Sequence, residues 1–225
     1  MDSIWVVIPA YNEQQVIGGV LRELIEQNKS FNIVVVDDGS KDDTAKEAAK
    51  YPIHILQHPI NLGQGAALAT GFEYALLKNA DVVVTFDADG QMRPEDIEKL
   101  VGKIKEGFDV ALGSRFLDIK PQDMPALRKF LLRLVVAFTR ATGGLNVTDI
   151  HNGFRAFKAD ALRQIVITQN QMAHASEILS EIKRNKLKYC EVPVGIRYTD
   201  YSKKKGQSIL NSINILYELL TRGKK

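Results

Sequence analysis

The chain has 225 residues, of which 45% are hydrophobic and 25% charged, and its formal net charge is +3. This length suits one domain with a full core, and the ordinary composition excludes a disordered or collagen-like chain. The single cysteine, Cys190, excludes an intrachain disulfide and favours a reducing compartment. No apolar run reaches about 18 residues and no basic leader precedes the first run, so we expect a cytoplasmic protein without a membrane span or signal peptide.

Short apolar runs alternate with helical patterns in the first half of the chain. The strand-like runs are residues 4–8, 33–36, 53–56, 82–86 and 110–112. The helical patterns are residues 16–25, a short segment from 43, and residues 65–77 and 94–104. Strands that are apolar throughout and alternate with helices indicate an α/β fold, with a parallel sheet covered on both faces.

The pattern changes after Arg115. Two strongly apolar stretches predict amphipathic helices at 126–142 and 208–220, and basic residues are spaced along the first of them. Between them, we expect a polar, glycine-bearing segment at 146–155, a helix at 177–182 and a strand at 192–197. The apolar surroundings of Cys190 predict a small core residue there.

Polar motifs follow several of the predicted strands. PAYNE follows the first strand, DDGS the second, DAD the fourth and GSR the fifth. In parallel sheets of this kind the ligand lies at the carboxyl ends of the strands. We therefore expect the chemistry of the protein at this edge of the sheet.

The central motif is Asp87-Ala88-Asp89. Two carboxylates one residue apart at a strand end can share Mg²⁺ or Mn²⁺, which prefer oxygen ligands and leave positions for water and substrate phosphates. The same acids could instead cap the next helix. An EF-hand is disfavoured, because Glu98 fits position twelve of that loop but Met92 stands where the loop needs glycine.

Two further motifs each allow two interpretations. Asp37 or Asp38 can accept hydrogen bonds from a base or a ribose hydroxyl, but DDGS is also typical of a turn. The run NLGQGAAL resembles part of a dinucleotide fingerprint, yet Leu68 replaces its third glycine and the run follows the third strand. A nicotinamide-dependent enzyme is therefore disfavoured. Close approach of the glycine backbone to phosphate or to a neighbouring strand stays open.

Taken in order, six motifs resemble those of the family 2 glycosyltransferases with the GT-A fold. They are PAYNE, VVVDDGSKDDT, NLGQGAALATGF, FDADGQMRPE, GSR and HNGFRAF, and the resemblance covers residues 4–210. The nearest likeness is to the dolichol-phosphate mannose synthase branch and its bacterial polyprenyl-phosphate relatives. The resemblance implies a single Rossmann-like α/β domain over 1–225 with a mostly parallel sheet. It implies a nucleotide-binding half at 1–116 and an acceptor or interface half at 117–225.

The resemblance also implies roles for individual residues. The nucleotide pocket is expected at Pro9, Tyr11 and Glu13, and the base at Asp37 beside Val35, with Asp38 as the alternative. The metal is expected on Asp87 and Asp89, which flank Ala88, with Gln91 as a further ligand or donor contact. Phosphate contacts are expected from Arg115 and Arg128, and from Arg197 with either Lys203 or Lys205, in the R-x5-K pattern of the mannose synthase branch.

The implied reaction is a single displacement with inversion at the anomeric carbon of a nucleoside-diphosphate sugar. The metal, held by Asp89, would stabilise the leaving diphosphate together with Arg115 and Arg197. A polyprenyl phosphate acceptor is already ionised and needs no general base. A glycan hydroxyl acceptor would need one, for which Asp149 and Glu177 are candidates. Glu177 is equally well explained as a solvated helix residue.

The basic residues of the second half suggest an anionic partner. The tail from Lys203 to Lys225 has six basic residues against a single acid, Glu218. Basic amphipathic helices can lie in a membrane interface or contact a membrane-protein partner, but they can equally pack on the core or on a second subunit. We expect a lipid-phosphate acceptor, a peripheral location on the inner face of the membrane, and no nucleic-acid partner. The non-enzymatic alternative is a nucleotide-sugar-binding subunit of a membrane complex.

Overall fold

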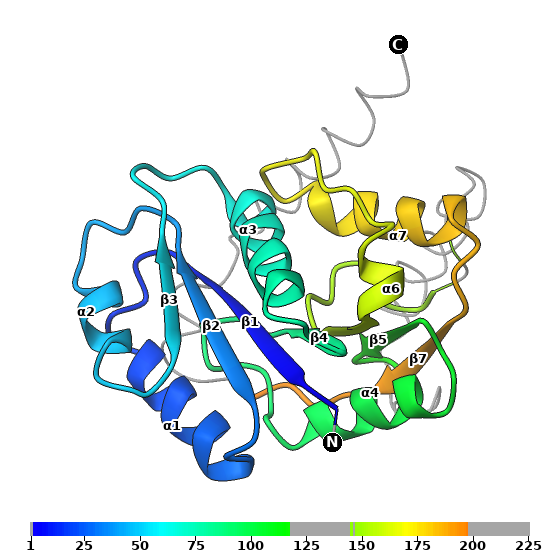
Figure 1. The fold of residues 1–225 in the computed structure, drawn as a ribbon, viewed down its shortest axis with the longest axis horizontal. Coiled ribbons are helices and arrows are strands. Elements are labelled where there is room, and N and C mark those ends of the chain that lie inside the picture. The colour runs from blue at the N-terminus through cyan, green and yellow to red at the C-terminus, as the bar shows by residue number, and fades with distance from the viewer. Residues whose placement is uncertain (1, 118–144, 146, 198–225) are drawn as a thin grey trace, which may run out of the picture.

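The computed structural model describes residues 2–117, 145 and 147–197 (Figure 1). These residues form a seven-stranded sheet with the strand order β3-β2-β1-β4-β6-β5-β7. The strands are β1 Ile4–Ala10, β2 Asn32–Asp37, β3 His54–Gln57, β4 Val82–Thr85, β5 Val110–Ser114, β6 Arg155–Lys158 and β7 Tyr189–Pro193. The helices are α1 Ile17–Gln27, α2 Thr44–Ala48, α3 Gln64–Leu77, α4 Asp96–Lys105, α6 Ala159–Leu162 and α7 His174–Arg184.

The sheet is mostly parallel, as the sequence predicts. β1 pairs in parallel with β2 and β4, β2 with β3, and β5 with β7. β6 is antiparallel to both of its neighbours, β4 and β5. The carboxyl ends of β4 and β5 therefore lie at the same edge of the sheet, with the start of β6 between them.

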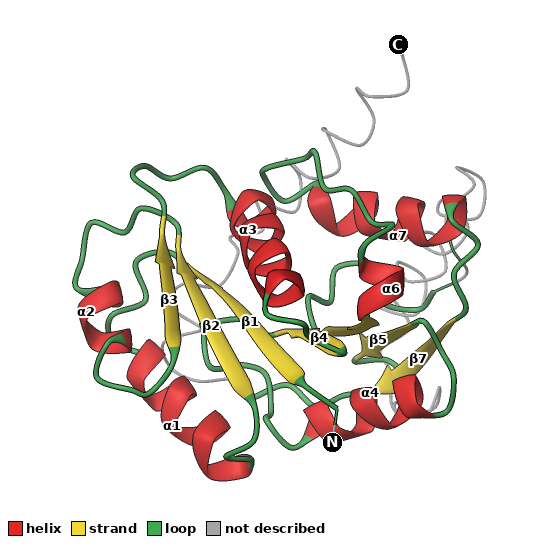
Figure 2. Cartoon of the chain, in the orientation of Figure 1, coloured by secondary structure: helices red, strands yellow, loops and turns green. Residues whose placement is uncertain are grey.

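Helices cover both faces of the sheet (Figure 2). Val6 and Ile8 of β1 belong to a first core with α1 and α4, whereas Trp5 and Val7 belong to a second core with α3, α6 and α7. Successive side chains of a strand point to opposite faces, so a strand covered on both sides must be apolar throughout. This explains the unbroken apolar runs of β1 and β2.

Several elements of the second half differ from the sequence expectation. The sequence pattern predicts neither β6 nor α6, because RAFK is short and has a basic residue at each end. The strand expected at 192–197 begins earlier in the chain, as β7. β7 lies at the edge of the sheet, and most of its residues are half-buried, so they form no continuous apolar run. Cys190 within β7 is half-buried and packs against the first core. The helix expected at 177–182 is the middle of α7.

The two predicted amphipathic helices, at 126–142 and 208–220, lie outside the described residues. Their contact with a membrane, the core or a partner therefore stays a prediction. No helix within residues 2–117, 145 and 147–197 is long and apolar enough to cross a membrane. The division into halves at residues 116 and 117 also stays a prediction, and segments from both sides of it contribute strands to one sheet.

α3 packs closely on the sheet at Gly71. A Cβ atom at this position would lie 2.3 Å from Cγ1 of Val7 and 3.3 Å from Cγ2 of Val36. The missing side chain therefore permits the close contact between helix and sheet. Gly102 in α4 is the opposite case, because a Cβ atom there would have no heavy atom within 4 Å.

We predict that Gly71→Ala lowers the free energy of unfolding by about 1–3 kcal/mol, because the added methyl group overpacks the core beside Val7. Gly102→Ala is the matched control and should raise the free energy of unfolding by about 0.5–1 kcal/mol, because alanine favours the helix. Urea unfolding measures both changes. A Gly71→Ala protein as stable as the wild type would contradict the close packing of α3.

Candidate active site

The loops that follow β1 and β2 are joined to each other at the carboxyl edge of the sheet. The backbone N–H of Asn12 donates to Oγ of Ser40 at 2.9 Å. The backbone N–H of Glu13 donates to Oγ1 of Thr44 at 2.8 Å. The PAYNE and DDGS motifs therefore form one continuous wall, as their positions after neighbouring parallel strands predict.

The residues expected to bind the nucleotide differ in exposure. Tyr11 is exposed, whereas Glu13 is buried beside the DDGS loop. Pro9 is buried in β1, and Val35 lies wholly within the first core. Tyr11 and Glu13 thus lie on the loop itself, while Pro9 and Val35 belong to the strands that carry the two loops.

Asp38 holds the loop that follows β3. Its carboxylate accepts hydrogen bonds from the backbone N–H groups of Leu62 at 2.9 Å and Gly63 at 2.7 Å. It also contacts Nδ1 of His58 at 2.7 Å. Asp37 accepts two longer hydrogen bonds, of 3.2 and 3.3 Å. Of the two neighbouring carboxylates, Asp37 therefore keeps more capacity for a ligand.

The two aspartates that follow β4 line one small cavity of about 70 Å³. Its lining residues are Asp87, Asp89, Gln91, Met92, Arg115, residues 151–154 and residues 194–196. Ala88 is buried in the first core. The structure therefore brings together four of the expected site residues, namely Asp87, Asp89, Gln91 and Arg115.

Asp87 is buried beside a second carboxylate, which makes its ionised form unfavourable. Burial raises the pKa of Asp87 to about 7, and the charge of Asp89 adds to the shift, whereas Arg155 and Arg115 oppose it. Nε2 of Gln64 donates a hydrogen bond to Oδ1 of Asp87 at 3.2 Å. A divalent cation would stabilise the ionised form of Asp87, so the residues fit a Mg²⁺ or Mn²⁺ site.

The protein offers few ligands for such an ion. Within residues 2–117, 145 and 147–197, no three His, Cys, Asp or Glu side chains gather into a metal site. Gln91 lines the cavity, and its backbone N–H donates to Oδ1 of Asp89 at 3.0 Å. Two carboxylates, with the remaining positions left to water and phosphate, are typical of Mg²⁺ bound together with a substrate phosphate.

Arg115 is oriented by a buried partner. Its Nε donates to Oδ2 of Asp149 at 2.6 Å, and its Nη2 donates to Oδ1 at 2.7 Å. The backbone N–H of Arg115 also donates to Oδ2 of Asp149, at 3.1 Å. The side chain of Asp149 is 2% exposed, that of Arg115 36%. Asp149 therefore acts on the cavity through Arg115, as an orienting partner.

Arg155, at the start of β6, is a site residue that the sequence does not reveal. It is buried, and its guanidinium donates to the carbonyl oxygens of Asn152 and Ile150 at 3.1 Å and of Ala175 at 3.2 Å. Burial lowers its pKa to about 10, although Asp149 and Asp87 favour the charged form. Its one sequence signal is an arginine inside the apolar end of HNGFRAF. Arg155 supplies a fixed positive charge near Asp87.

Glu177 holds a loop and does not line the cavity. Its carboxylate accepts hydrogen bonds from the backbone N–H groups of Thr168 at 3.0 Å and Gln169 at 2.9 Å. The held loop then contacts α3, since the backbone N–H of Gly65 donates to the carbonyl oxygen of Asn170 at 2.8 Å. The expected role of Glu177 as a base therefore gains no support from this geometry.

The glycines of NLGQG permit a close approach that the sequence does not predict. A Cβ atom at Gly65 would lie 2.1 Å from the carbonyl oxygen of Gln169, and one at Gly63 would lie 2.3 Å from that of Asn170. The close approach that the structure shows is therefore to a loop of the same chain and not to a neighbouring strand, while an approach to phosphate stays a prediction. Gln64, between the two glycines, is the residue that reaches Asp87.

Arg197 lies at the end of the described segment and contacts two acids. Its Nη1 lies 2.7 Å from a carboxylate oxygen of Glu23, and its Nη2 lies 3.4 Å from one of Glu95. Its backbone N–H donates to the carbonyl oxygen of Gln91 at 2.9 Å. Contact of Arg197 with phosphate stays a prediction. Arg128, Lys203 and Lys205 lie outside the described residues.

The comparison with known families agrees with this geometry. The sequence profile described as Glycosyl transferase family 2 matches residues 5–166. The chain belongs to glycosyl transferase family 2. The family predicted from the six motifs is thereby confirmed.

Comparison with individual relatives places the chain more closely within this family. It is 39% identical to an uncharacterized protein of Methanocaldococcus jannaschii, with 97% of this chain and 91% of that protein covered. It is 37% identical to the UDP-N-acetylglucosamine–dolichyl-phosphate N-acetylglucosaminyltransferase of Methanococcus voltae, with 96% and 94% covered. It is 31% identical to the dolichol-phosphate mannosyltransferase of Pyrococcus furiosus, with 97% and 64% covered. The predicted polyprenyl-phosphate branch is thus confirmed.

A solved structure shows the same fold. The glucosyl-3-phosphoglycerate synthase of Mycobacterium tuberculosis, in complex with Mn²⁺, UDP and glucosyl-3-phosphoglycerate, matches with a TM-score of 0.70 at 22% identity. The match covers 95% of this chain and 75% of that one. The GT-A fold predicted for this family 2 glycosyltransferase is therefore confirmed.

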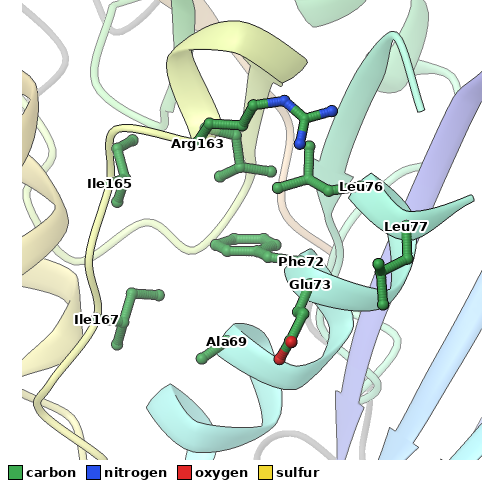
Figure 3. A pocket seen from close by; sticks show the side chains of 9 residues that line it. Ala69, Phe72, Glu73, Leu76, Leu77, Arg163, Ile165 and Ile167 are labelled. Atoms are coloured by element: carbon green, nitrogen blue, oxygen red, sulfur yellow. The ribbon is translucent and has the colours of Figure 1, made fainter. Parts of the chain in front are cut away.

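A larger hollow of this glycosyltransferase lies away from the carboxylate pair. It measures about 290 Å³ and lies between α3 and residues 162–167 (Figure 3). Figure 3 shows Phe72 between Leu76 on the same helix and Ile165 on the facing segment. Its walls are chiefly apolar, and they carry neither Asp87 nor Arg115. The smaller cavity is therefore the candidate active site.

We predict that Arg115→Ala lowers the free energy of unfolding by about 1–3 kcal/mol, because the buried Asp149 would keep its charge and lose two hydrogen bonds. The double variant Arg115→Ala/Asp149→Asn should recover at least half of this loss, because the amide carries no charge. Urea unfolding of both variants and of Asp149→Asn completes a double-mutant cycle. Equal stability of Arg115→Ala and the double variant would show that leaving Asp149 without Arg115 has no cost.

Proposed function

We propose that this glycosyltransferase moves a sugar from a nucleoside-diphosphate donor to a polyprenyl phosphate, with a divalent cation at Asp87 and Asp89. One observation carries the proposal. Two carboxylates and an oriented arginine line one cavity at the carboxyl edge of the sheet, where α/β folds bind ligands. The dolichyl-phosphate specificity in the names of two relatives supports the acceptor class.

The donor nucleotide would lie along the wall formed by the PAYNE and DDGS loops. Asp37 would accept hydrogen bonds from the base, because Asp38 is engaged by Leu62, Gly63 and His58. Tyr11 and Glu13 lie on the adjoining loop. The diphosphate would then reach the cavity at the end of β4, since the two loops and the cavity share the carboxyl edge of the sheet.

Asp87 and Asp89 would hold Mg²⁺ or Mn²⁺, with Gln91 nearby. When bound, the cation supplies positive charge that stabilises the departing diphosphate. Arg115 adds a fixed guanidinium, which Asp149 holds in one orientation. Arg155 supplies buried positive charge behind Asp87 without exposing it to solvent. Arg128, Arg197 and one of the two lysines, Lys203 or Lys205, would complete the phosphate contacts.

We infer the class of acceptor from two carboxylates that are already bonded to other groups of the protein. Asp149 is paired with Arg115, and Glu177 accepts hydrogen bonds from its own loop. Neither is placed to take a proton from an acceptor. A phosphate oxyanion is already a nucleophile and needs no general base. We therefore favour a lipid phosphate, delivered at the cytoplasmic face of a membrane, with the second half of the chain or a membrane-protein partner making the contact.

We predict that Asp89→Asn reduces sugar transfer by about 100-fold or more, because a metal ligand is lost while the shape of the loop is kept. The same variant should lose the stabilisation that a nucleoside diphosphate gives with Mn²⁺, measured by thermal shift with UDP and GDP. Asp160→Asn is the matched control, since that aspartate is 80% exposed on α6. Full transfer activity in Asp89→Asn would refute the metal site, whereas absence of transfer in the wild type would favour a non-catalytic subunit.

We predict that transfer requires a phosphorylated lipid. A radiolabel assay with a polyprenyl phosphate should give product, and the matching polyprenol, which lacks the phosphate, should give a rate at least ~100-fold lower, because Asp149 and Glu177 are both engaged and do not activate a hydroxyl. Glycans with free hydroxyl groups should likewise be inactive. Comparable rates with the alcohol and the phosphate would replace the lipid-phosphate assignment with transfer to a hydroxyl.

A further inference from the structure

Asn152 carries a buried hydrogen-bond donor that the protein leaves unused. The residue is 6% exposed, and its Oδ1 accepts a hydrogen bond from the backbone N–H of Phe154 at 3.0 Å. This bond fixes which end of the amide is the oxygen. Nδ2 is the one buried side-chain nitrogen or oxygen without a partner in the part of the chain that the structure describes. Leaving such a donor unpaired costs stability.

The turn that holds this amide is rigid. The carbonyl oxygen of Asn152 accepts a hydrogen bond from Nε of Arg155 at 3.1 Å, so the residue is held by its side chain and its backbone. Arg155 is itself buried and tied to α7 through the carbonyl oxygen of Ala175. The side chain therefore cannot turn outward to find water without breaking the turn.

The turn lies directly against the carboxylate pair. A Cβ atom on the next residue, Gly153, would lie 3.1 Å from Oδ2 of Asp87. Asn152 lines the same cavity as Asp87, Asp89 and Arg115. Nδ2 nevertheless bonds to neither carboxylate. Residues 2–117, 145 and 147–197 therefore supply no acceptor for Nδ2, and a ligand bound in the cavity can supply one.

We propose that the side-chain amide of Asn152 donates a hydrogen bond to a phosphate oxygen of a bound reactant. A phosphate oxygen is an acceptor with no proton to give, and the guanidinium of Arg115 in the same cavity favours an anion there. The inference rests on the proposed function, which brings two phosphates to this cavity. They are the diphosphate of the donor and the phosphate of the acceptor.

Asn152→Ser removes the donor at the position of Nδ2 and keeps an oxygen that can accept from the N–H two residues on. The serine side chain is shorter, so its hydroxyl proton does not reach the place of Nδ2. Asn185→Ser is the matched control. Nδ2 of Asn185 donates to the carbonyl oxygen of Gln164 at 2.8 Å, and Asn185 does not line the cavity. Calorimetry measures binding of UDP and GDP with Mn²⁺ in one arm, and of a short-chain isoprenyl phosphate added to that complex in the other. Urea unfolding measures the stability of each unliganded protein.

Asn152→Ser should be at least as stable as the wild type without ligand, and should bind one phosphate ligand about tenfold more weakly, or ~1.4 kcal/mol. Weaker binding in the first arm assigns the donor diphosphate, and weaker binding in the second assigns the acceptor phosphate. Asn185→Ser should lose stability and bind both ligands normally. Unchanged binding by Asn152→Ser, with or without a loss of stability, overturns the inference. A wild type that binds neither ligand overturns the proposed function as well, so the two failures are distinguishable.

Discussion

The rest of the candidate site depends on one constraint, the burial of Asp87 beside a second carboxylate at the end of β4. Burial and the charge of Asp89 raise the pKa of Asp87 to about 7 despite the nearby guanidinium groups of Arg155 and Arg115. An arrangement that disfavours its own ionised form is stabilised by any cation that binds it. The ionised form of Asp87 is therefore unfavourable without a cation, and a bound cation would stabilise it. Shifted pKa values of this kind are common at functional sites.

The surrounding residues keep that arrangement in place. Arg155 binds three carbonyl oxygens and so ties the turn at 150–153 to α7, while Asp149, just before this turn, fixes Arg115. On the other side, Glu177 holds the loop that packs on the first turn of α3, from which Gln64 reaches Asp87. Residues outside the cavity thus determine the position of the carboxylates through rigid intermediates. This explains why Glu177 can matter to the site without touching a substrate.

The sequence predicts the first five strands and the polar motifs after them, because strands buried on both faces leave unbroken apolar runs. It fails for β6 and β7, where a basic residue such as Arg155 or a half-exposed edge hides the pattern. It also predicts the pairing of Asp87 with Asp89, since one residue of spacing at a strand end suffices. It cannot separate Asp37 from Asp38, because that distinction depends on a loop contributed by β3. The sequence also cannot predict which residues the NLGQG glycines contact, since Asn170 lies about a hundred residues later in the chain.

The charge pairing within the site also constrains which acceptors are chemically reasonable. For a hydroxyl acceptor, a carboxylate must take up a proton, and Asp149 could do so only by weakening its bonds to Arg115. That would free the guanidinium just when the departing diphosphate needs it fixed. For a phosphate acceptor, the nucleophile arrives ionised, and every charged pair can stay intact throughout the displacement. A cavity in which Arg115 is held by Asp149 and Glu177 is held by its own loop is therefore better matched to joining two phosphate-bearing reactants than to activating an alcohol with either carboxylate.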